Sequence, residues 1–503
     1  MRTDPRLPLV VAPLALALGV RIAIGGQPAF TTDDAYISLH SARHLLETVD
    51  PSFIGSRPLH GATSPLHVFV LAAVMAARIP PLWAVELVTW VGASLYLLGA
   101  ATLICRRVPS APWRVALMLL TAFVSYTPMH LSNGQETPFA MAAVMWALVW
   151  LDDDAPGRVR LPVLAGLLVW LRPDLLVLTL LVLVTRWRSA PEARRRDALL
   201  TTAGIAAWLV VNSWTIGNPV PNTMMAKSEF FAFYGFPWWF NTIVGGTRLW
   251  WFIRFTGPAV VSLVWCFSKP NDRLIGMALL VTILALGVQS SIVLDHNFFR
   301  YLHPLACTAM LAGFTVLVSS RPRTALAVVS ASLLAIGVMA PERWRDYRRS
   351  QVVVVDMQGA IAGWINTNAP DATVLIHDAG MLSEFTRARL VDMVGLKMPA
   401  ATVLHRRFTG PTQGRGRGDA LHALACETQP TLYVAFNTWE QLFRLSDGLR
   451  SHGWGVNEVF HREIQALTGP QRFTLYRLTP PASCPAGDGL VSRRNQLPVD
   501  SGS

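Results

Sequence analysis

Two adjacent aspartates, Asp33 and Asp34, follow directly after the first apolar segment of the chain. Carboxylates are costly close to a lipid bilayer, and where they occur they usually mark a catalytic site or a substrate path. A carboxylate in such a place can act as a general base toward a hydroxyl nucleophile. The simpler interpretation is a helix that begins here, with one of the two aspartates as its N-cap. From these two residues alone both interpretations stay open.

Four further groups of polar residues lie between apolar segments. They are Glu136, Arg172 with Asp174, the turn from Asn218 to Lys227 that includes Asn222, and the stretch from Asp295 to Arg300 that includes His296 and is followed by Tyr301. Lysine and arginine can bind a phosphate and stabilise it as it leaves. Acids and cations together therefore predict chemistry on an anionic substrate delivered by a membrane.

Each of these groups also has a structural alternative. Arg172 and Asp174 can pair across a helix kink, and Lys227 can extend its ammonium toward the interface. Arg300 can be a topology charge, and Glu136 can cap the helix that follows it. When each residue is considered alone, its structural alternative is favoured in most cases. When all five groups are considered together, a functional site is favoured.

The composition indicates the class of protein that must position these residues. The chain is 52% hydrophobic and 15% charged, against about 25% charged in soluble domains. Its 18 Trp and 22 Phe residues fit aromatic belts at two membrane interfaces. The net charge of +12 comes largely from short loops such as 186–196, where the positive-inside rule explains it. We therefore expect a polytopic membrane protein that does not bind nucleic acid.

The first apolar run, residues 7–24, fits either a signal peptide or a first transmembrane helix that stays in place. We expect the uncleaved helix, because Arg21 interrupts the run and no clean small-residue cleavage site follows it. The amino terminus is then cytoplasmic. Asp33 and Asp34 are then predicted to emerge on the outer face of the membrane.

The distribution of arginine predicts about eleven crossings within residues 1–340, with a first outer loop over residues 25–64. Residues 65–79 are shorter than the roughly 20 residues that a crossing needs, so we expect them to be interfacial or re-entrant. The segment 161–185 is broken at Arg172-Pro173-Asp174, because proline removes an amide donor and restricts the preceding residue. The aromatic-rich residues 230–252 are expected at the interface.

The C-terminal part differs in character from the apolar segments. Residues 341–484 are predicted to form an extracytoplasmic α/β domain, with strand-like runs before Gly380 and at 389–394, 431–436 and 472–478. Residues 485–503 are predicted to be disordered. Cys426 and Cys484 either form one disulfide, if this part lies outside the cytoplasm, or remain two free thiols.

Five motifs in this order resemble the GT-C superfamily of membrane glycosyltransferases. They are Asp33-Asp34-Ala35-Tyr36-Ile37-Ser38, Gly134-Gln135-Glu136-Thr137-Pro138, Leu171-Arg172-Pro173-Asp174, Pro219-Val220-Pro221-Asn222-Thr223 with Ala226-Lys227, and Arg300-Tyr301-Leu302-His303-Pro304. The chain looks most like bacterial members similar to the mycobacterial terminal arabinofuranosyltransferase. Protein O-mannosyltransferases and the lipid A aminoarabinose transferase resemble it more distantly. The resemblance covers residues 30 to about 400.

The resemblance implies a helical GT-C-like membrane domain that works at the outer face of the bacterial inner membrane. It implies inverting transfer of a sugar, such as arabinofuranose or another pentose or hexose, from a polyprenyl-phosphate donor. The acceptor would be a hydroxyl of a cell-envelope glycan, lipid or protein. A divalent metal is left open, with Asp33 and Asp34 as its candidate ligands.

The resemblance also implies roles for the site residues. Asp33 is expected to be the general base, with Asp34 beside it in acceptor or metal binding. The residues expected to bind substrate are Glu136, Arg172, Asp174, Asn222, Lys227, His296, Arg300 and Tyr301, with Lys227 and Arg300 holding the donor phosphate. This chain has Asp174 where many relatives have Glu, and Gln135 where many have Leu. These departures weaken the roles implied for Asp174 and Glu136.

The competing prediction is a transporter or flippase of a lipid-linked or anionic envelope precursor. Such proteins also use broken helices and outward-facing charges. Against it, the sequence has no repeated halves, and a sizeable outer domain is more typical of enzymes that act on envelope acceptors.

Overall fold

The computed structural model describes residues 5–24, 26–47, 52–53, 56–153, 158–231, 238–289, 297–466, 469–482 and 484. Contacts divide the chain into two compact units, each assembled from three segments. The bundle unit comprises residues 1–28, 82–208 and 236–347, and the sheet unit comprises residues 29–81, 209–235 and 348–503. The first predicted outer loop therefore groups with the C-terminal part of the chain. The predicted domain boundary near residue 340 stays a prediction.

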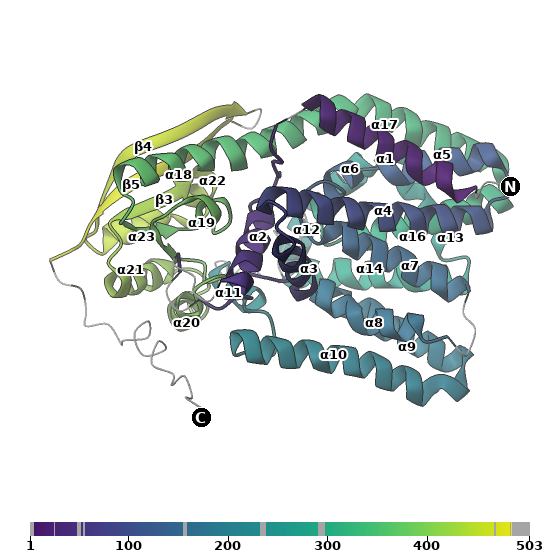
Figure 1. Cartoon of the computed structure of the whole chain (residues 1–503), viewed down its shortest axis with the longest axis horizontal. Coiled ribbons are helices and arrows are strands. Elements are labelled where there is room, and N and C mark those ends of the chain that lie inside the picture. Colours follow the sequence, from purple (N-terminus) through teal and green to yellow (C-terminus); the bar gives the residue numbers. More distant parts are fainter. Residues whose placement is uncertain are drawn as a thin grey trace. The chain divides into compact units, whose positions relative to one another are not determined.

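The bundle unit is helical. Its helices are α1 (Arg6–Ile24), α4 (Pro81–Arg107), α5 (Ala111–Phe123), α6 (Thr127–His130), α7 (Thr137–Asp152), α8 (Arg160–Leu171), α9 (Leu176–Ser189), α12 (Trp238–Thr256), α13 (Leu263–Cys266), α14 (Pro270–Gln289) and α16 (His303–Ser320), while α10 (Arg194–Ile216) and α17 (Pro322–Gln351) contribute residues to both units. Helix α16 packs against α7, α13 and α14 at the centre of this bundle (Figure 1).

Five helical stretches of the described residues are long and apolar enough to cross a membrane. They are Pro81–Arg107, Pro191–Ile216, Gly246–Cys266, Asn297–Ser320 and Pro322–Asn368. The apolar part of Asn297–Ser320 is 94% buried, against 17% for Pro322–Asn368. A largely exposed apolar segment needs a nonpolar solvent, so the apolar part of Pro322–Asn368 suits a lipid-facing position, whereas its C-terminal end, α18 (Gln358–Asn368), packs against a β-sheet. The predicted total of about eleven crossings stays a prediction.

The predicted break in the segment 161–185 is present. Helix α8 ends at Leu171, a short 3₁₀ turn spans Pro173–Leu175, and α9 begins at Leu176. Arg172 has an extended backbone, with φ −158° and ψ 122°, as expected for a residue that precedes proline. Helix α3 (Pro65–Ala76) has 12 residues, which agrees with the prediction that this segment is too short to cross.

The sheet unit holds a five-stranded sheet with the strand order β2-β1-β3-β5-β4. The strands are β1 (Thr373–Ile376), β2 (Arg389–Asp392), β3 (Leu432–Phe436), β4 (Gly455–Ala466) and β5 (Gly469–Thr479). Strand β1 runs parallel to both β2 and β3, and β5 runs antiparallel to β3 and β4. The strand-like runs predicted near 389–394, 431–436 and 472–478 therefore lie on strands.

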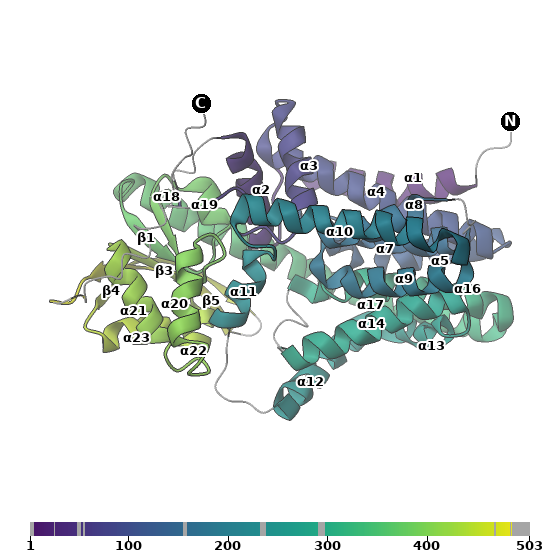
Figure 2. The same cartoon turned by 90° about the horizontal axis from the view of Figure 1, so that it is seen from below.

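Helices cover both faces of this sheet (Figure 2). They are α18 (Gln358–Asn368) and α19 (Met381–Phe385) on one face, and α20 (Pro399–Phe408), α21 (Arg417–Thr428) and α23 (Leu445–Ser451) on the other, with α22 (Asn437–Phe443) following β3. Side chains alternate along a strand, so Val374 and Ile376 pack under α18 and α19 whereas Leu375 packs under α20 and α21.

Three helices from outside the C-terminal segment belong to the same unit. They are α2 (Asp33–Leu46), α3 and α11 (Asn222–Phe230). Helix α2 contacts α3 and α19, and α11 contacts α20. In addition, Phe53 forms a parallel bridge with Leu390 of the edge strand β2, which covers a sheet edge that would otherwise present unpaired backbone groups.

Cys426 and Cys484 form a disulfide, with their Cα atoms 5.5 Å apart. This favours the first of the two alternatives predicted for these cysteines. Disulfides persist mainly in oxidising compartments. The segment 485–503, predicted to be disordered, lies outside the described residues.

Candidate active site

The Asp33 carboxylate accepts two hydrogen bonds from the backbone at the start of α19. The amide of Gly380 donates to Oδ2 at 2.8 Å, and the amide of Met381 donates to Oδ1 at 2.7 Å. A Cβ atom on Gly380 would lie 2.1 Å from the Asp33 backbone carbonyl oxygen and 2.6 Å from both the Asp33 carboxylate carbon and Oδ1. Glycine is therefore the residue that lets the backbone approach this carboxylate so closely.

Neighbouring groups change the proton affinity of Asp33. Burial raises the pKa of Asp33 well above its usual range, and the negative charges of Asp378 and Asp34 raise it further. The amide hydrogen bonds from Met381 and Gly380 act in the opposite direction and lower the pKa. A carboxylate with a raised pKa is a stronger base than an ordinary aspartate, and its two amide contacts hold its orientation. The predicted N-cap alternative is not observed, because Asp33 is the first residue of α2 and Thr32 occupies the cap position.

The end of strand β2 also engages helix α2. Asp392 is fully buried and accepts hydrogen bonds from three backbone amides of the following loop, including that of Lys397 at 2.6 Å. The Lys397 ammonium lies 2.9 Å from the Ser41 hydroxyl oxygen and 3.0 Å from His40 Nδ1, both on α2. Through Asp33 and Lys397, the ends of β1 and β2 thus fix the helix that carries the two aspartates.

Helix α11 carries Asn222 and Lys227. The Asn222 side-chain amide donates to the carbonyl oxygens of Gly395 and Leu396 at 2.5 and 3.2 Å, so this predicted substrate ligand holds the loop after β2. Lys227 is partly exposed. Within the described part of the chain its ammonium has no hydrogen-bond or ion-pair partner, which leaves it available to an anion.

Four predicted site residues meet within the bundle unit. Arg172, only 1% exposed, donates to both carboxylate oxygens of Asp174 at 3.1 and 3.0 Å and to the carbonyl oxygen of Arg300 at 2.6 Å. The guanidinium carbons of Arg172 and Arg300 lie 4.6 and 5.0 Å from the centre of the Tyr301 ring. The pairing of Arg172 with Asp174 across the helix break is therefore present, and it orients Arg172.

Glu136 occupies the N-cap position of α7 but makes no capping hydrogen bond with its side chain, although the residue is only 7% exposed. The capping alternative predicted for Glu136 is therefore wrong, and its role in substrate binding stays a prediction. His296, predicted to bind substrate, lies outside the described residues.

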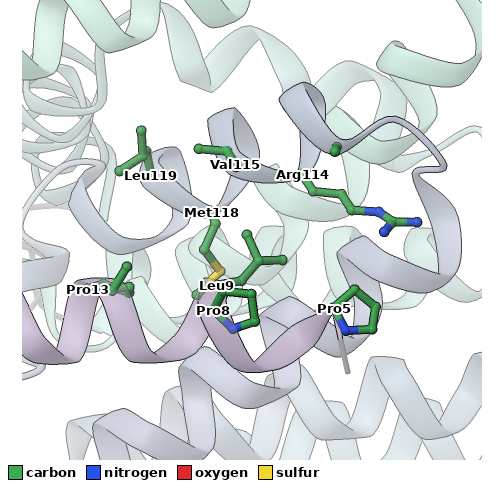
Figure 3. Close-up of a pocket in the computed structure, with 10 residues that line it drawn as sticks. Pro5, Pro8, Leu9, Pro13, Arg114, Val115, Met118 and Leu119 are labelled. Atoms are coloured by element: carbon green, nitrogen blue, oxygen red, sulfur yellow. The ribbon is translucent and has the colours of Figure 1, made fainter. Parts of the chain in front are cut away.

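The bundle unit also has a cavity of about 320 Å³ between α1 and α5 (Figure 3). Prolines, aliphatic side chains, Met118 and Arg114 line it. Among the residues that the structure describes, the lining includes no carboxylate and no predicted site residue.

No group of three or more His, Cys, Asp or Glu side chains among the described residues is arranged to hold a metal ion. The Asp33 oxygens are engaged by amide donors. A divalent metal held by Asp33 and Asp34 therefore stays an expectation of the resemblance.

Sequence reasoning did not single out Asp378 or Gly380 as site residues. They lie at the carboxyl end of a predicted strand, which is where open α/β sheets place ligand-binding groups. Their position at the end of a predicted strand, rather than their residue types, could have identified Asp378 and Gly380 as candidate site residues.

Parts of the chain are similar to known proteins. A family model described as a domain of unknown function (DUF8728) matches residues 344–476, and no curated protein matches the chain. Arabinofuranosyltransferase AftD from Mycobacteria is 14% identical, with a TM-score of 0.46 over 95% of this chain, and this chain spans 40% of its length.

ArnT from Cupriavidus metallidurans is also similar. Its apo structure is 14% identical, with a TM-score of 0.49 over 94% of this chain and 98% of that protein. Its structure bound to undecaprenyl phosphate is 13% identical, with a TM-score of 0.46 over 92% and 97% of the two chains.

Proposed function

We propose that this protein is an integral membrane glycosyltransferase that transfers a sugar from a polyprenyl-phosphate donor to a hydroxyl of an envelope glycan, lipid or protein. The observation that carries the proposal is the Asp33 carboxylate, which two amides hold in place and whose pKa is raised by burial and by Asp378. An oriented carboxylate of this kind suits a general base.

In the proposed reaction, the acceptor hydroxyl loses its proton to a carboxylate oxygen of Asp33 as its oxygen attacks the anomeric carbon of the donor sugar. The bond between that carbon and the phosphate oxygen breaks, and the bonding electrons leave with polyprenyl phosphate. A single displacement inverts the configuration at the anomeric carbon. Because the leaving group is an anion, a nearby cation stabilises it.

Lys227 is our proposed ligand of the donor phosphate, because it is partly exposed and unpaired within the described residues. Arg300 keeps the same proposed role, with Arg172 as the residue that orients it through the carbonyl of Arg300. An ammonium binds phosphate as a point charge, whereas a guanidinium offers a planar fork of donors.

We further propose that the site lies at the outer face of a bacterial inner membrane, with the C-terminal domain outside the cytoplasm. The Cys426–Cys484 disulfide supports this location, since disulfides are rare in the reducing cytosol. The motif resemblance favours a pentofuranose such as arabinofuranose, or another pentose or hexose, as the sugar.

The test uses purified full-length protein in lipid nanodiscs and a panel of polyprenyl-phosphate sugars with cell-envelope extract as acceptor. We expect one donor to release polyprenyl phosphate, and Asp33→Asn to abolish that release. Asp447→Asn is the matched control, because its side chain is 52% exposed and, among the described residues, pairs with the surface arginines Arg444 and Arg450. Absence of release with every donor would contradict the transferase proposal, and vesicle uptake of a lipid-linked precursor would then favour the transporter alternative.

A further inference from the structure

The carboxyl ends of strands β1 and β3 form a second candidate site in the sheet unit. From β1 the chain passes through α19 to β2 on one side, and then returns across β1 to reach β3 on its other side. The connections therefore diverge between β1 and β3. In open α/β sheets, ligands bind outside the carboxyl ends of the strands at this switch point.

Aromatic side chains gather at this point. His377 directly follows β1, and its ring stacks on that of Trp439, which follows β3, with the ring centres 4.6 Å apart and the planes 19° apart. The Phe231 ring lies 5.9 Å from Trp439. Trp439 and Phe231 are both partly exposed, whereas the neighbouring Phe443 is buried. The cluster therefore continues from the core to an accessible aromatic surface.

His377 brings an unsatisfied polar atom into this cluster. The residue is 5% exposed, its Nδ1 lies 3.3 Å from an Asp378 carboxylate oxygen, and its Nε2 has no hydrogen-bond partner in the described part of the chain. A buried polar atom without a partner is costly, because it has lost its hydrogen bonds to water without gaining others. Such atoms are rare in native proteins and call for an explanation.

The same turn carries the contact to Asp33. The amides that bind its carboxylate belong to Gly380 and Met381, directly after Asp378 and Ala379. Lys227 precedes Phe231 by four residues, a spacing that places both side chains on the same face of a helix. The aromatic cluster is thus linked to the proposed base through the turn that follows His377, and to the proposed phosphate ligand Lys227 through Phe231.

We propose that His377, Trp439 and Phe231 form a subsite that binds the ring of a sugar. The face of an aromatic ring is electron-rich, so it attracts the weakly positive C–H bonds of a sugar ring, while a sugar hydroxyl supplies the missing partner of His377 Nε2. Apolar walls with a few polar groups are typical of ligand sites. The subsite rests on the proposed function in one respect, which is that the sugar belongs to the donor or the acceptor of that reaction.

Binding is measured by saturation-transfer NMR on the full-length protein in lipid nanodiscs, with methyl pentofuranosides and methyl hexopyranosides as probes. The decisive variant is His377→Phe, which keeps the stacked ring and removes both ring nitrogens. We expect the dissociation constant of the bound glycoside to rise about tenfold, as for loss of one hydrogen bond to a buried group, while the melting temperature stays equal or rises.

Trp439→Phe and Trp439→Ala test the stacking surface. We expect Trp439→Phe to retain most of the affinity and Trp439→Ala to lose it. Trp364→Ala is the matched control, because Trp364 is a partly buried tryptophan on the opposite face of the same sheet. If no glycoside binds the wild-type protein, the proposal is wrong. It is also wrong if His377→Phe binds the glycoside as tightly as wild type, or if Trp439→Ala binds it no more weakly than Trp364→Ala, because the cluster is then only core packing.

Turnover kinetics identify the source of the sugar. A rise in KM for the acceptor alone in His377→Phe assigns the subsite to the acceptor, and a rise for the donor alone assigns it to the donor sugar. Glycoside binding does not depend on turnover. If the variants bind the glycoside more weakly but the wild-type protein has no transferase activity, the subsite is supported and the proposed reaction is refuted. If the wild-type protein is active but the variants bind the glycoside unchanged, the reaction is supported and the subsite is refuted.

Discussion

Replacing Gly380 by alanine tests the geometry of the proposed base most directly. The new Cβ would lie 2.1 Å from the Asp33 backbone carbonyl oxygen and 2.6 Å from the Asp33 carboxylate carbon, whereas ordinary contacts begin near 3.4 Å. The start of helix α2 and the Gly380 turn must therefore move apart by about 1 Å, which displaces the carboxylate, and at least one of its hydrogen bonds from Gly380 and Met381 is lost. The backbone of Gly380, with φ −99° and ψ −83°, lies outside the left-handed region, so the effect is steric.

Two independent estimates of the magnitude overlap. A hydrogen bond to a charged group contributes about 1.5–3 kcal/mol, which corresponds to a change in rate of roughly tenfold to a hundredfold. A displacement of about 1 Å at a catalytic group also lowers the rate by about a hundredfold. We therefore expect kcat of the Gly380→Ala protein to fall by about two orders of magnitude, with little change in KM for the lipid-linked donor.

The assay is release of polyprenyl phosphate by reconstituted protein, measured across a range of pH. Gly363→Ala is the matched control, because a Cβ on this exposed helical glycine meets nothing within 4 Å, and alanine there is expected to stabilise α18 slightly. A Gly380→Ala protein with wild-type kcat and a wild-type pH profile would refute the view that these amides position Asp33. Equal loss of activity in Gly363→Ala would point to general destabilisation.

Further predictions concern charge and covalent structure in the sheet unit. The charge of Asp378 raises the pKa of Asp33, so Asp378→Asn should lower that pKa. The part of the pH profile in which kcat/KM rises with pH should then move to lower pH, and an unchanged profile would contradict an effect of Asp378 on Asp33. Burial raises the pKa of Glu384 from 4.5 to about 7, so the folded state binds this proton more tightly than the unfolded state. Its stabilisation should be complete below about pH 4 and be lost as the pH rises through 7, by about 3 kcal/mol in total; chemical denaturation of Glu384→Gln should lack this dependence. The Cys426–Cys484 bridge closes a loop with a separation of 58 residues, so Cys426→Ser with Cys484→Ser should lower the unfolding free energy by about 4 kcal/mol in the chain-entropy model, and an unchanged denaturation midpoint would contradict this.

Local sequence features were sufficient for several parts of the fold. The composition predicted a membrane protein, Pro173 predicted the break between α8 and α9, and alternating apolar runs predicted strands β2, β3 and β5. Each of these features depends on a few consecutive residues. Hydropathy, the missing amide of proline and strand periodicity act within one segment, so the sequence carries them directly.

The sequence also pointed to Asp33, Arg172 and Lys227, but it left their environments undetermined. For Arg172 and Asp174 the sequence left two alternatives, pairing with each other or binding substrate. Their pairing could be predicted because the two residues are only two positions apart. Asn222 was predicted to bind substrate, whereas its side-chain amide holds the loop after β2. Side-chain roles of this kind depend on which backbone atoms a distant segment supplies.

Only the tertiary structure decided what holds Asp33. Its carboxylate is bound by amides 347 and 348 residues further along the chain, and the first-loop helix α2 belongs to the same unit as the C-terminal sheet. Likewise, His377 and Trp439 follow different strands and meet because β1 and β3 are parallel neighbours. The sequence by itself therefore determined the class of protein and the residues able to do chemistry. Their proton affinities and partners arise from long-range packing, because burial and hydrogen bonding are properties of the folded neighbourhood and not of the local segment.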